Sequence, residues 1–261
     1  MRQMHAFQLN ATMLLRAATL NLEQDHKRWD QRRELIAEQL GDLKPDVFAL
    51  NEVCIPRQTA RWLQQTARER FGIEYALVQQ TRPNGLSQVE GEALLTRFPI
   101  IETGNLDFRT RDIVALVARL LVDGRPLDVY VTHLYASSGE DSLRLYQVQQ
   151  LLDWIDSRTD ISARIVCGDF NAALDKPSAA LMATRFKPSQ TAPTAPTPLA
   201  DSAGNVTHPG RARMSQCIDY IWLSGALRPV KSAVCFNRPS PADETLWPSD
   251  HAGVWADIDM A

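Results

Sequence analysis

Residues 163–171 read ARIVCGDFN, and the rest of the chain is organised around this stretch. Its apolar part, from Ala163 to Cys167, predicts a short strand that is buried on both faces. The run then ends at Gly168-Asp169-Phe170-Asn171, which places a carboxylate and a carboxamide two residues apart after the strand. Asp and Asn are also common in turns, where their side chains bond the local backbone. The choice between a turn and a site depends on whether this arrangement recurs.

The arrangement does recur, because a polar residue follows three other expected strands. These residues are Asn21 after residues 14–20, Glu52 after residues 47–50 and His133 after residues 127–132. Asn21 and Glu52 are 31 positions apart, while His133 and Asp169 are 36 apart, and a helix is expected in each interval. In layered α/β folds ligands bind beyond the carboxyl ends of strands. The repeated unit therefore predicts a site at one rim of a sheet.

The remaining hydrophobic pattern completes an α/β chain. Further strands are expected at residues 75–78, 92–97, 113–122, 218–223, 229–236 and 253–258, and helices at 29–40, from Pro56 to 71, and at 140–156. The proline-rich residues 187–199 predict an irregular surface loop that is too short to separate two domains. We expect a single domain over residues 13–261, preceded by a loose leader at residues 1–12.

Composition excludes some classes of protein. The 261 residues are 44% hydrophobic and 23% charged, with a net charge of −3. A protein that coats long nucleic acid would carry a marked basic excess. We find no secretion signal and no apolar run long enough to cross a membrane. The four cysteines form no CxxC pair and are expected to be reduced, which favours a cytoplasmic protein.

Eight polar residues make up the candidate site: Asn21, Glu52, His133, Asp169, Asn171, Asp219, Asp250 and His251. Carboxylate and carboxamide oxygens suit a hard cation such as Mg²⁺ or Mn²⁺. Histidines beside carboxylates suit general base and acid chemistry. A glutamate after a strand is often only a helix cap, and Asp250-His251 after Pro248 is also typical of a turn. Asp219 within an apolar strand is harder to dismiss, because a buried carboxylate needs a partner.

Eight segments in one order resemble the endonuclease/exonuclease/phosphatase superfamily. They are ATLNL (18–22), PDVFALNEV (45–53), EALLTRFPI (92–100), VTHL (131–134), RLYQ (144–147), GDFN (168–171), IDYI (218–221) and SDH (249–251). The superfamily includes pancreatic deoxyribonuclease, abasic-site endonucleases of the exonuclease III type, neutral sphingomyelinases and inositol-polyphosphate 5-phosphatases. The resemblance implies an α/β fold, a four-layer α/β/β/α sandwich of two mixed sheets with helices on the outer faces, as in deoxyribonuclease I.

The resemblance also implies roles for the site residues. Glu52 resembles the family's ligand for Mg²⁺ or Mn²⁺, with Asp250 as a second contributor and Asn21 binding the metal site or a nearby phosphate. Asp169 and Asn171 resemble the pair that orients the attacking water and the scissile phosphate. His251, paired with Asp219, resembles the general base or phosphate contact. His133 resembles the histidine that assists the developing charge or the leaving group, and its carboxylate partner is Glu90 or Glu92.

Three departures from the family pattern stand out. Asn51 precedes Glu52 where the family usually has Gln, and Gln216-Cys217 replaces a frequent Arg before the strand aspartate. VTHLYASS replaces the Tyr-x-Pro-Asn segment of the exonuclease III branch, which argues against an abasic-site repair enzyme. Arg111, before the strand at 113–122, is either a contact for the substrate phosphate or an exposed structural arginine.

The sequence therefore predicts divalent-metal-dependent hydrolysis of a phosphate ester, with a phosphodiester favoured. Metal and histidine charges would offset the charge that develops on the phosphate oxygens while a base activates water. Nucleic acid and a small phosphodiester are both open as substrates. Alternatives are a phospholipid phosphodiesterase, a phosphomonoesterase, or a binding scaffold with the same fold and no turnover.

Overall fold

The computed structural model describes residues 14–23, 28–82, 89–136, 141–196, 199–200, 206–207, 214–225 and 227–260. The expected leader at residues 1–12 lies outside the described residues. Four helices are found in the described chain: α1 (Trp29–Leu43), α2 (Thr59–Phe71), α3 (Asp141–Ser157) and α4 (Pro177–Ala183).

Two six-stranded mixed sheets form the centre of the molecule. Sheet one has the order β15 (Arg228–Cys235), β16 (Gly253–Asp259), β1 (Leu14–Asn21), β2 (Val47–Cys54), β4 (Glu90–Thr96) and β3 (Ala76–Thr81). Sheet two has the order β5 (Ile100–Asp107), β6 (Val114–Val122), β7 (Arg125–His133), β8 (Arg164–Asp169), β14 (Asp219–Ser224) and β9 (Phe186–Pro188). Smaller strand pairs join β10 (Ala195–Pro196) to β13 (Met214–Gln216) and β11 (Leu199–Ala200) to β12 (Val206–Thr207).

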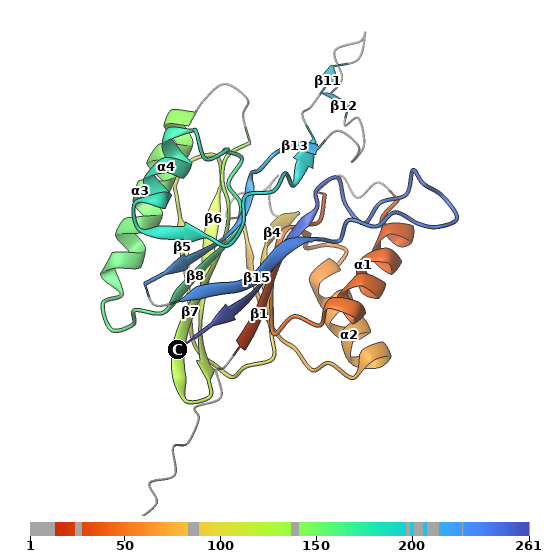
Figure 1. The fold of residues 1–261 in the computed structure, drawn as a ribbon, viewed down its shortest axis with the longest axis horizontal. Coiled ribbons are helices and arrows are strands. Elements are labelled where there is room, and N and C mark those ends of the chain that lie inside the picture. The colour runs from red at the N-terminus through yellow and green to blue at the C-terminus, as the bar shows by residue number, and fades with distance from the viewer. Residues whose placement is uncertain are drawn as a thin grey trace, which may run out of the picture.

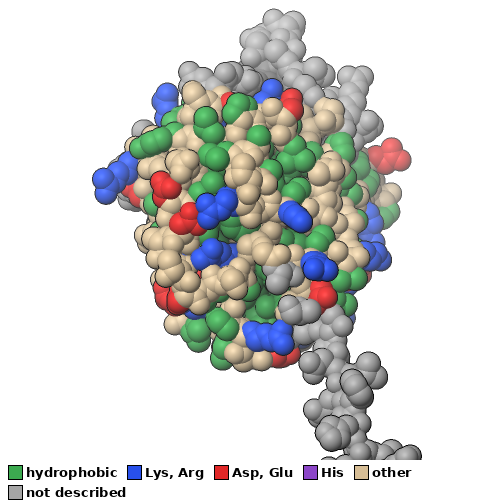
Figure 2. Space-filling model, turned by 60° about the vertical axis from the view of Figure 1, so that its left-hand side comes forward, with side chains coloured by type: hydrophobic (Ala, Val, Ile, Leu, Met, Phe, Trp, Pro, Cys, Tyr) green, Lys and Arg blue, Asp and Glu red, His purple; other side chains and the backbone are tan. Residues whose placement is uncertain are grey.

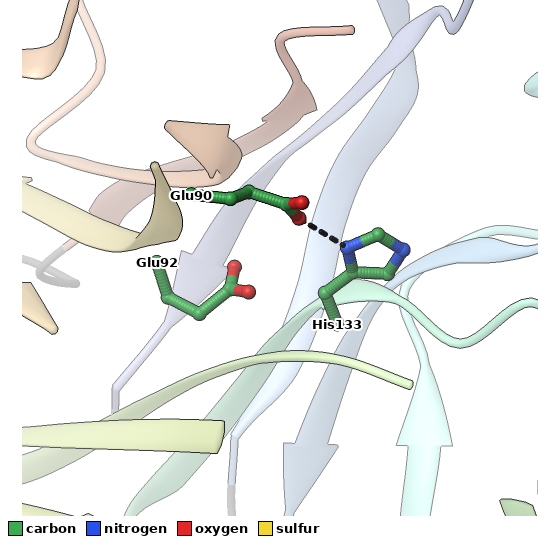
Figure 3. A group of neighbouring side chains, drawn as sticks. All are labelled: Glu90, Glu92 and His133. Atoms are coloured by element: carbon green, nitrogen blue, oxygen red, sulfur yellow. Dashed lines mark ion pairs between the residues drawn. The ribbon is translucent and has the colours of Figure 1, made fainter. Parts of the chain in front are cut away.

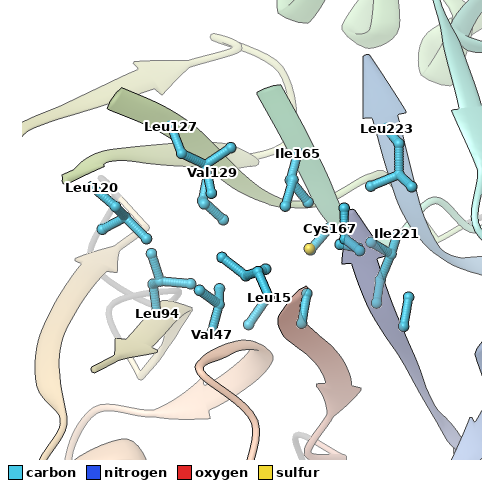
Figure 4. Close-up of a cluster of buried hydrophobic side chains, with 14 of the residues drawn as sticks. Leu15, Val47, Leu94, Leu120, Leu127, Val129, Ile165, Cys167, Ile221 and Leu223 are labelled. Atoms are coloured by element: carbon cyan, nitrogen blue, oxygen red, sulfur yellow. The ribbon is translucent and has the colours of Figure 1, made fainter. Parts of the chain in front are cut away.

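The alternation of side chains along the strands explains why the sheets stack. Successive strand residues point to opposite faces, so every second residue of a strand faces the other sheet. Leu15 and Val47 of sheet one meet Val129, Ile165 and their neighbours of sheet two in one buried cluster (Figure 4). All four of these side chains are fully buried.

The opposite face of each sheet is covered by helices (Figure 1). Sheet one packs against α1 and α2 through Leu20, Phe48 and Ile36, among others. Sheet two packs against α3 and α4 through Val166, Met182 and their neighbours. Helix, sheet, sheet and helix therefore form the four layers that the sequence predicted, and the fold prediction is confirmed.

The repeated unit seen in the sequence is a pair of parallel strands in each sheet. β1 pairs with β2 in parallel, so that Asn21 lies opposite Asn51, and β7 pairs with β8 in parallel, so that His133 lies opposite Asp169. α1 and α3 connect the members of these pairs. Because parallel strands end at the same edge, each sheet presents its two polar strand ends together.

Some expected elements differ from the structure. The second helix begins at Thr59 rather than at Pro56, because residues 55–58 form turns. β5 was not expected, since most of its residues are exposed and it lacks an apolar alternation. The loop expected at 187–199 contains part of β9 and all of β10, and β9 pairs with β14 because Phe186 is buried. α4 was too short to be expected from periodicity.

Lys and Arg side chains are interspersed with Asp and Glu on the face that carries α3 and α4 (Figure 2). Some opposite charges there are in contact, as are Arg185 and Asp156 at 2.6 Å. This distribution agrees with the small net charge of the chain. Among the described helices, none is long and apolar enough to span a membrane.

Candidate active site

The polar residues singled out in the sequence meet at one edge of the two stacked sheets. Asn21, His133 and Asp169 are the last residues of β1, β7 and β8. Asp219 is the first residue of β14, and because β14 runs antiparallel to β8 it pairs directly with Asp169. His251 comes from the loop before β16, which runs antiparallel to β1, so this loop returns to the same edge.

Irregular backbone conformations set the directions of the Glu52 and Asp169 side chains. The pairing of β2 with β4 shifts between Leu50 and Val53, and Glu52 within this irregular stretch has a φ of 54°. A bulge of this kind redirects side chains next to active sites. Gly168, just before Asp169, has a φ of 137° and lies against the backbone of β7, where an added Cβ would lie 1.9 Å from the Thr132 carbonyl oxygen.

Asn21 links two carboxylates that come from different sheets. Its Nδ2 donates to Glu52 Oε1 at 2.9 Å and to Asp169 Oδ2 at 3.2 Å. Burial raises the pKa of Glu52, helped by the charges of Asp250 and Glu90. Burial and the neighbouring charge of Asp219 likewise raise the pKa of Asp169. A bound cation would reduce the repulsion between these buried carboxylates and so stabilise their charged forms.

His251 is fixed by a buried carboxylate. Its Nδ1 lies 2.9 Å from Asp219 Oδ2 and 3.8 Å from Asp169 Oδ2. Since an ionised carboxylate only accepts, Nδ1 carries the proton in this pair. Burial opposes the charged ring, yet the charges of Asp219 and Asp250 and the hydrogen bond to Asp219 raise the pKa of His251 well above its ordinary value. The backbone N–H of His251 donates to Ser249 Oγ at 3.2 Å.

His133 lies between Glu90 on one side and the Asn21-linked carboxylates on the other. Its Nδ1 is 3.6 Å from Glu90 Oε1 (Figure 3), and its Nε2 is 3.7 Å from Asp169 Oδ2 and 4.0 Å from Glu52 Oε1. Burial opposes protonation, but Glu90 and then the charges of Asp169 and Glu52 outweigh it and raise the pKa of His133 to about 10. The carboxylates therefore favour the protonated ring, whereas Arg82 Nη2, 3.4 Å from Nδ1, opposes it.

The structure separates the two glutamates that the sequence left as alternatives. Glu90 forms the ion pair with His133, whereas Glu92 accepts a hydrogen bond from Asn51 Nδ2. Asn51 Nδ2 also donates to the Thr132 carbonyl oxygen at 3.1 Å, and Asn51 Oδ1 accepts from the Asp169 backbone N–H at 3.0 Å. The asparagine that departs from the family pattern thus connects both sheets directly beneath the site.

Asn171 and Asp250 lie at the margin of the cluster. The Asn171 backbone N–H donates to Asp169 Oδ1 at 2.8 Å, and its Nδ2 donates to the Leu134 carbonyl oxygen at 2.9 Å. Asp250 is half-buried and accepts from Ser249 Oγ at 3.2 Å. Ser249 Oγ also lies 2.6 Å from the Asn21 carbonyl oxygen, which anchors the SDH loop to β1.

Arg82 contacts the site directly, whereas Arg111 lies over Tyr135, two residues beyond His133. Arg111 is exposed, and its guanidinium carbon is 5.4 Å from the centroid of the Tyr135 ring. Arg82, which the sequence did not single out, places Nη2 2.5 Å from Glu90 Oε1. Nothing local in the sequence marks Arg82, because its place depends on the pairing of β3 with β4.

The donor set fits a divalent metal. The ligand atoms of Asp169, Asp219 and His251 lie within 4.8 Å of one another, and so do those of Glu90, Glu92 and His133. Glu52 adds a further carboxylate next to both groups. Oxygen-rich sites of this kind suit Mg²⁺ and Mn²⁺.

A family model described as "Endonuclease/Exonuclease/phosphatase family" matches residues 18–251, which include all eight polar residues. The chain belongs to this family. Its members are divalent-metal-dependent phosphoesterases, so the chain belongs to a family of hydrolases.

Three individual similarities accompany the family match. Nocturnin from Xenopus laevis is 29% identical over 161 residues, covering 56% of this chain and 40% of nocturnin. The CCR4-Not complex 3'-5'-exoribonuclease subunit Ccr4 from Kluyveromyces lactis is 25% identical over 189 residues, covering 56% of this chain and 24% of that subunit. The alignments therefore span less than half the length of these two relatives. The crystal structure of D. rerio TDP2 complexed with single strand DNA product superposes with a TM-score of 0.74 at 18% identity, over 95% of this chain and 99% of that one.

Proposed function

We propose that this family member is a Mg²⁺- or Mn²⁺-dependent phosphodiesterase, with nucleic acid as the favoured substrate and a small phosphodiester as the alternative. The observation that carries the proposal is the buried His251–Asp219 pair at 2.9 Å, beside the two carboxylates that Asn21 joins. Support for nucleic acid comes from the exoribonuclease Ccr4 and from TDP2 bound to a single-strand DNA product. We further propose that residues 13–261 act as one catalytic domain.

Glu52 would hold the metal ion, with Asp250 contributing from the SDH loop. When bound, the ion offsets negative charge on the phosphate oxygens. Asn21 donates to Glu52 and Asp169 through Nδ2, so we assign it the task of orienting these carboxylates toward a shared cation or phosphate. The raised pKa of Glu52, which burial causes, fits a carboxylate that gains stability when a cation neutralises its charge.

His251 would move the proton of the attacking water or contact the phosphate. Its Nδ1 is committed to Asp219, so Nε2 is the nitrogen that faces this task. Asp169 and Asn171, joined through the backbone N–H of Asn171, would orient the water and the phosphate. A carboxylate that fixes the imidazole tautomer is the usual support for such a histidine.

His133 would act on the opposite side of the phosphate. The neighbouring carboxylates raise its pKa to about 10, which favours a positively charged ring at neutral pH. A buried cation that is already in place stabilises the charge that develops on the leaving oxygen without reorganisation. Arg111, which is exposed and lies over Tyr135, would contact a further phosphate of the substrate.

We propose a cytoplasmic location from the state of the cysteines. Cys54, Cys167 and Cys217 are free thiols, and Cys54, Cys167 and Cys235 are buried. Burial raises the pKa of Cys167 and Cys217, so these thiols are protonated and unreactive at neutral pH. Free thiols of this kind are typical of a reducing compartment.

The test compares bis-p-nitrophenyl phosphate with p-nitrophenyl phosphate in Mg²⁺, Mn²⁺ or EDTA. We expect metal-dependent cleavage of the diester that falls by roughly 10²-fold or more in His251→Ala and Asp169→Ala. Asp153→Ala, which removes an exposed carboxylate on α3, is the matched control and should keep wild-type activity. Cleavage of the monoester alone would point to a phosphomonoesterase, and activity on neither ester would support a binding scaffold.

A further inference from the structure

Tyr135 lies two residues beyond His133 and is held rigidly by α3. Its backbone N–H donates to Gln147 Oε1 at 3.1 Å, and its carbonyl oxygen accepts from Arg144 Nη1 at 3.1 Å. Gln147 and Arg144 are both buried. The preceding Leu134 N–H donates to the Asp169 carbonyl oxygen at 2.9 Å. The position of Tyr135 is therefore fixed relative to the candidate active site.

The ring of Tyr135 carries a cation on its surface. The side chain is half-buried and packs against the apolar cluster between sheet two and α3. The Arg111 guanidinium lies over the ring, 5.4 Å from its centroid, and Arg111 itself is exposed. Arginine stacked on an aromatic ring keeps its N–H edge and its outer face available for a ligand.

The loop that carries Arg111 is held in an unusual conformation. Arg109, Arg111 and Asp112 have φ values of 52°, 53° and 57°. Such values are rare outside glycine, and clustered backbone strain is typical of functional positions. Gln147 Nε2 donates to Thr110 Oγ1 at 3.4 Å, so the glutamine that fixes Tyr135 also binds this loop. The buried Gln147 side chain thus holds both Tyr135 and the loop that carries Arg111.

We propose that Arg111 and Tyr135 form a subsite for an unpaired nucleotide, so that the substrate is single-stranded nucleic acid. The guanidinium edge pairs with a phosphate next to the scissile one, and a base continues the stack on the outer face of Arg111. Bases stack on aromatic side chains and on arginine planes when a strand is single. This inference rests on the proposed phosphodiesterase activity.

A nucleotide fits this subsite better than a lipid does. An acyl chain would need an apolar wall, whereas the exposed element here is a planar cation. Bases within a duplex are already stacked on one another, so the free face of Arg111 is matched by an unpaired base. The near-neutral net charge of the chain also favours a short strand, because long duplexes are bound through many basic contacts.

The experiment measures kcat and KM on two substrates of equal length and charge: hexathymidylate and a hexamer of abasic tetrahydrofuran nucleotides. Tyr135→Leu should lower kcat/KM on hexathymidylate roughly tenfold, mainly through KM, and change cleavage of the abasic strand less than about twofold. Arg111→Lys keeps the charge and loses the plane, so it should show the same selective loss. Tyr135→Phe keeps the ring and should behave as wild type.

Tyr146→Leu is the matched control, because Tyr146 is an exposed tyrosine on α3 and should leave both substrates unaffected. Equal losses on the two substrates, or no loss in either Tyr135→Leu or Arg111→Lys, would overturn the subsite and leave the phosphodiesterase proposal intact. If wild-type protein cleaves neither strand nor bis-p-nitrophenyl phosphate, the proposed function fails and the subsite fails with it. Arg111→Lys tests the idea even if Tyr135→Leu does not fold, since Arg111 is exposed.

Discussion

Replacing Gly168 by alanine should destabilise the protein far more than an ordinary glycine substitution. The new Cβ would lie 1.9 Å from the Thr132 carbonyl oxygen and 3.0 Å from Asn51 Oδ1. Gly168 also has a φ of 137°, which L-residues rarely adopt. β7 and β8 would have to move apart at the point where Thr132 pairs with Gly168.

The size of the effect follows from three contributions. Backbone strain costs about 1–2 kcal/mol, and forcing atoms into a packed site costs about 1–3 kcal/mol. Reduced entropy of the unfolded chain returns about 0.4–1 kcal/mol. The net loss for Gly168→Ala is therefore about 1–5 kcal/mol, which for a chain of this size lowers the Tm by about 2–20 °C.

Gly124→Ala is the matched control. Gly124 also has a positive φ, of 81°, but an added Cβ there would meet no atom within 4 Å. Its net loss should be about 1 kcal/mol or less. Urea and thermal unfolding of the two variants beside wild type measure the difference. Equal stability of Gly168→Ala and Gly124→Ala would show that the close approach of β7 to β8 is not what requires glycine in the GDFN segment.

Three more variants test other parts of the structure. Glu52→Gln should abolish the rise in Tm that Mn²⁺ produces in wild type, a rise worth about 2.7 kcal/mol at one hundred times Kd; an unchanged rise would remove Glu52 from the metal site. Asp219→Asn should lower kcat on a phosphodiester by roughly 10²–10⁴-fold with little change in folding, and wild-type kcat would contradict the proposed tautomer role. Asp128→Asn should cost about 1–3 kcal/mol, because Arg119 and Arg158 lose their shared buried carboxylate and keep only the more exposed Glu102 and Asp160. Burial opposes ionisation of Asp128, but those arginines lower its pKa; wild-type stability should therefore fall as the pH drops below about 4, and denaturant unfolding should show a flatter pH dependence in the variant.

The strands that carry the site could be predicted from the sequence because they are buried on both faces. Residues such as Val166 and Phe48 face helices while their neighbours face the other sheet, and this leaves continuous apolar runs with polar residues only at the ends. Asp219 could be recognised as needing a partner for the same reason. A buried carboxylate is stable only when paired, and His251 is that partner at 2.9 Å.

The choice between Glu90 and Glu92 could not be made from the sequence. Residues two apart on a strand face the same side, so both side chains point toward His133 by periodicity alone. The difference arises from Asn51, which is in contact with Glu92 only after β2 and β4 have paired across an irregular register. The Arg82–Glu90 ion pair likewise depends on the pairing of β3 with β4. The edge strand β5 could not be predicted because most of its residues are exposed, so its sequence shows no apolar alternation.

The order of the strands also has a consequence for synthesis on the ribosome. All six strands of sheet two lie between residues 100 and 224, so they emerge from the ribosome as one continuous piece. Sheet one instead places β1, made first, beside β16, made last. Glu52 and Asn21 belong to the sheet that β16 completes, so the centre should assemble only after β16 has been synthesised. Chains stalled before residue 253 should therefore show none of the proposed metal-dependent hydrolysis.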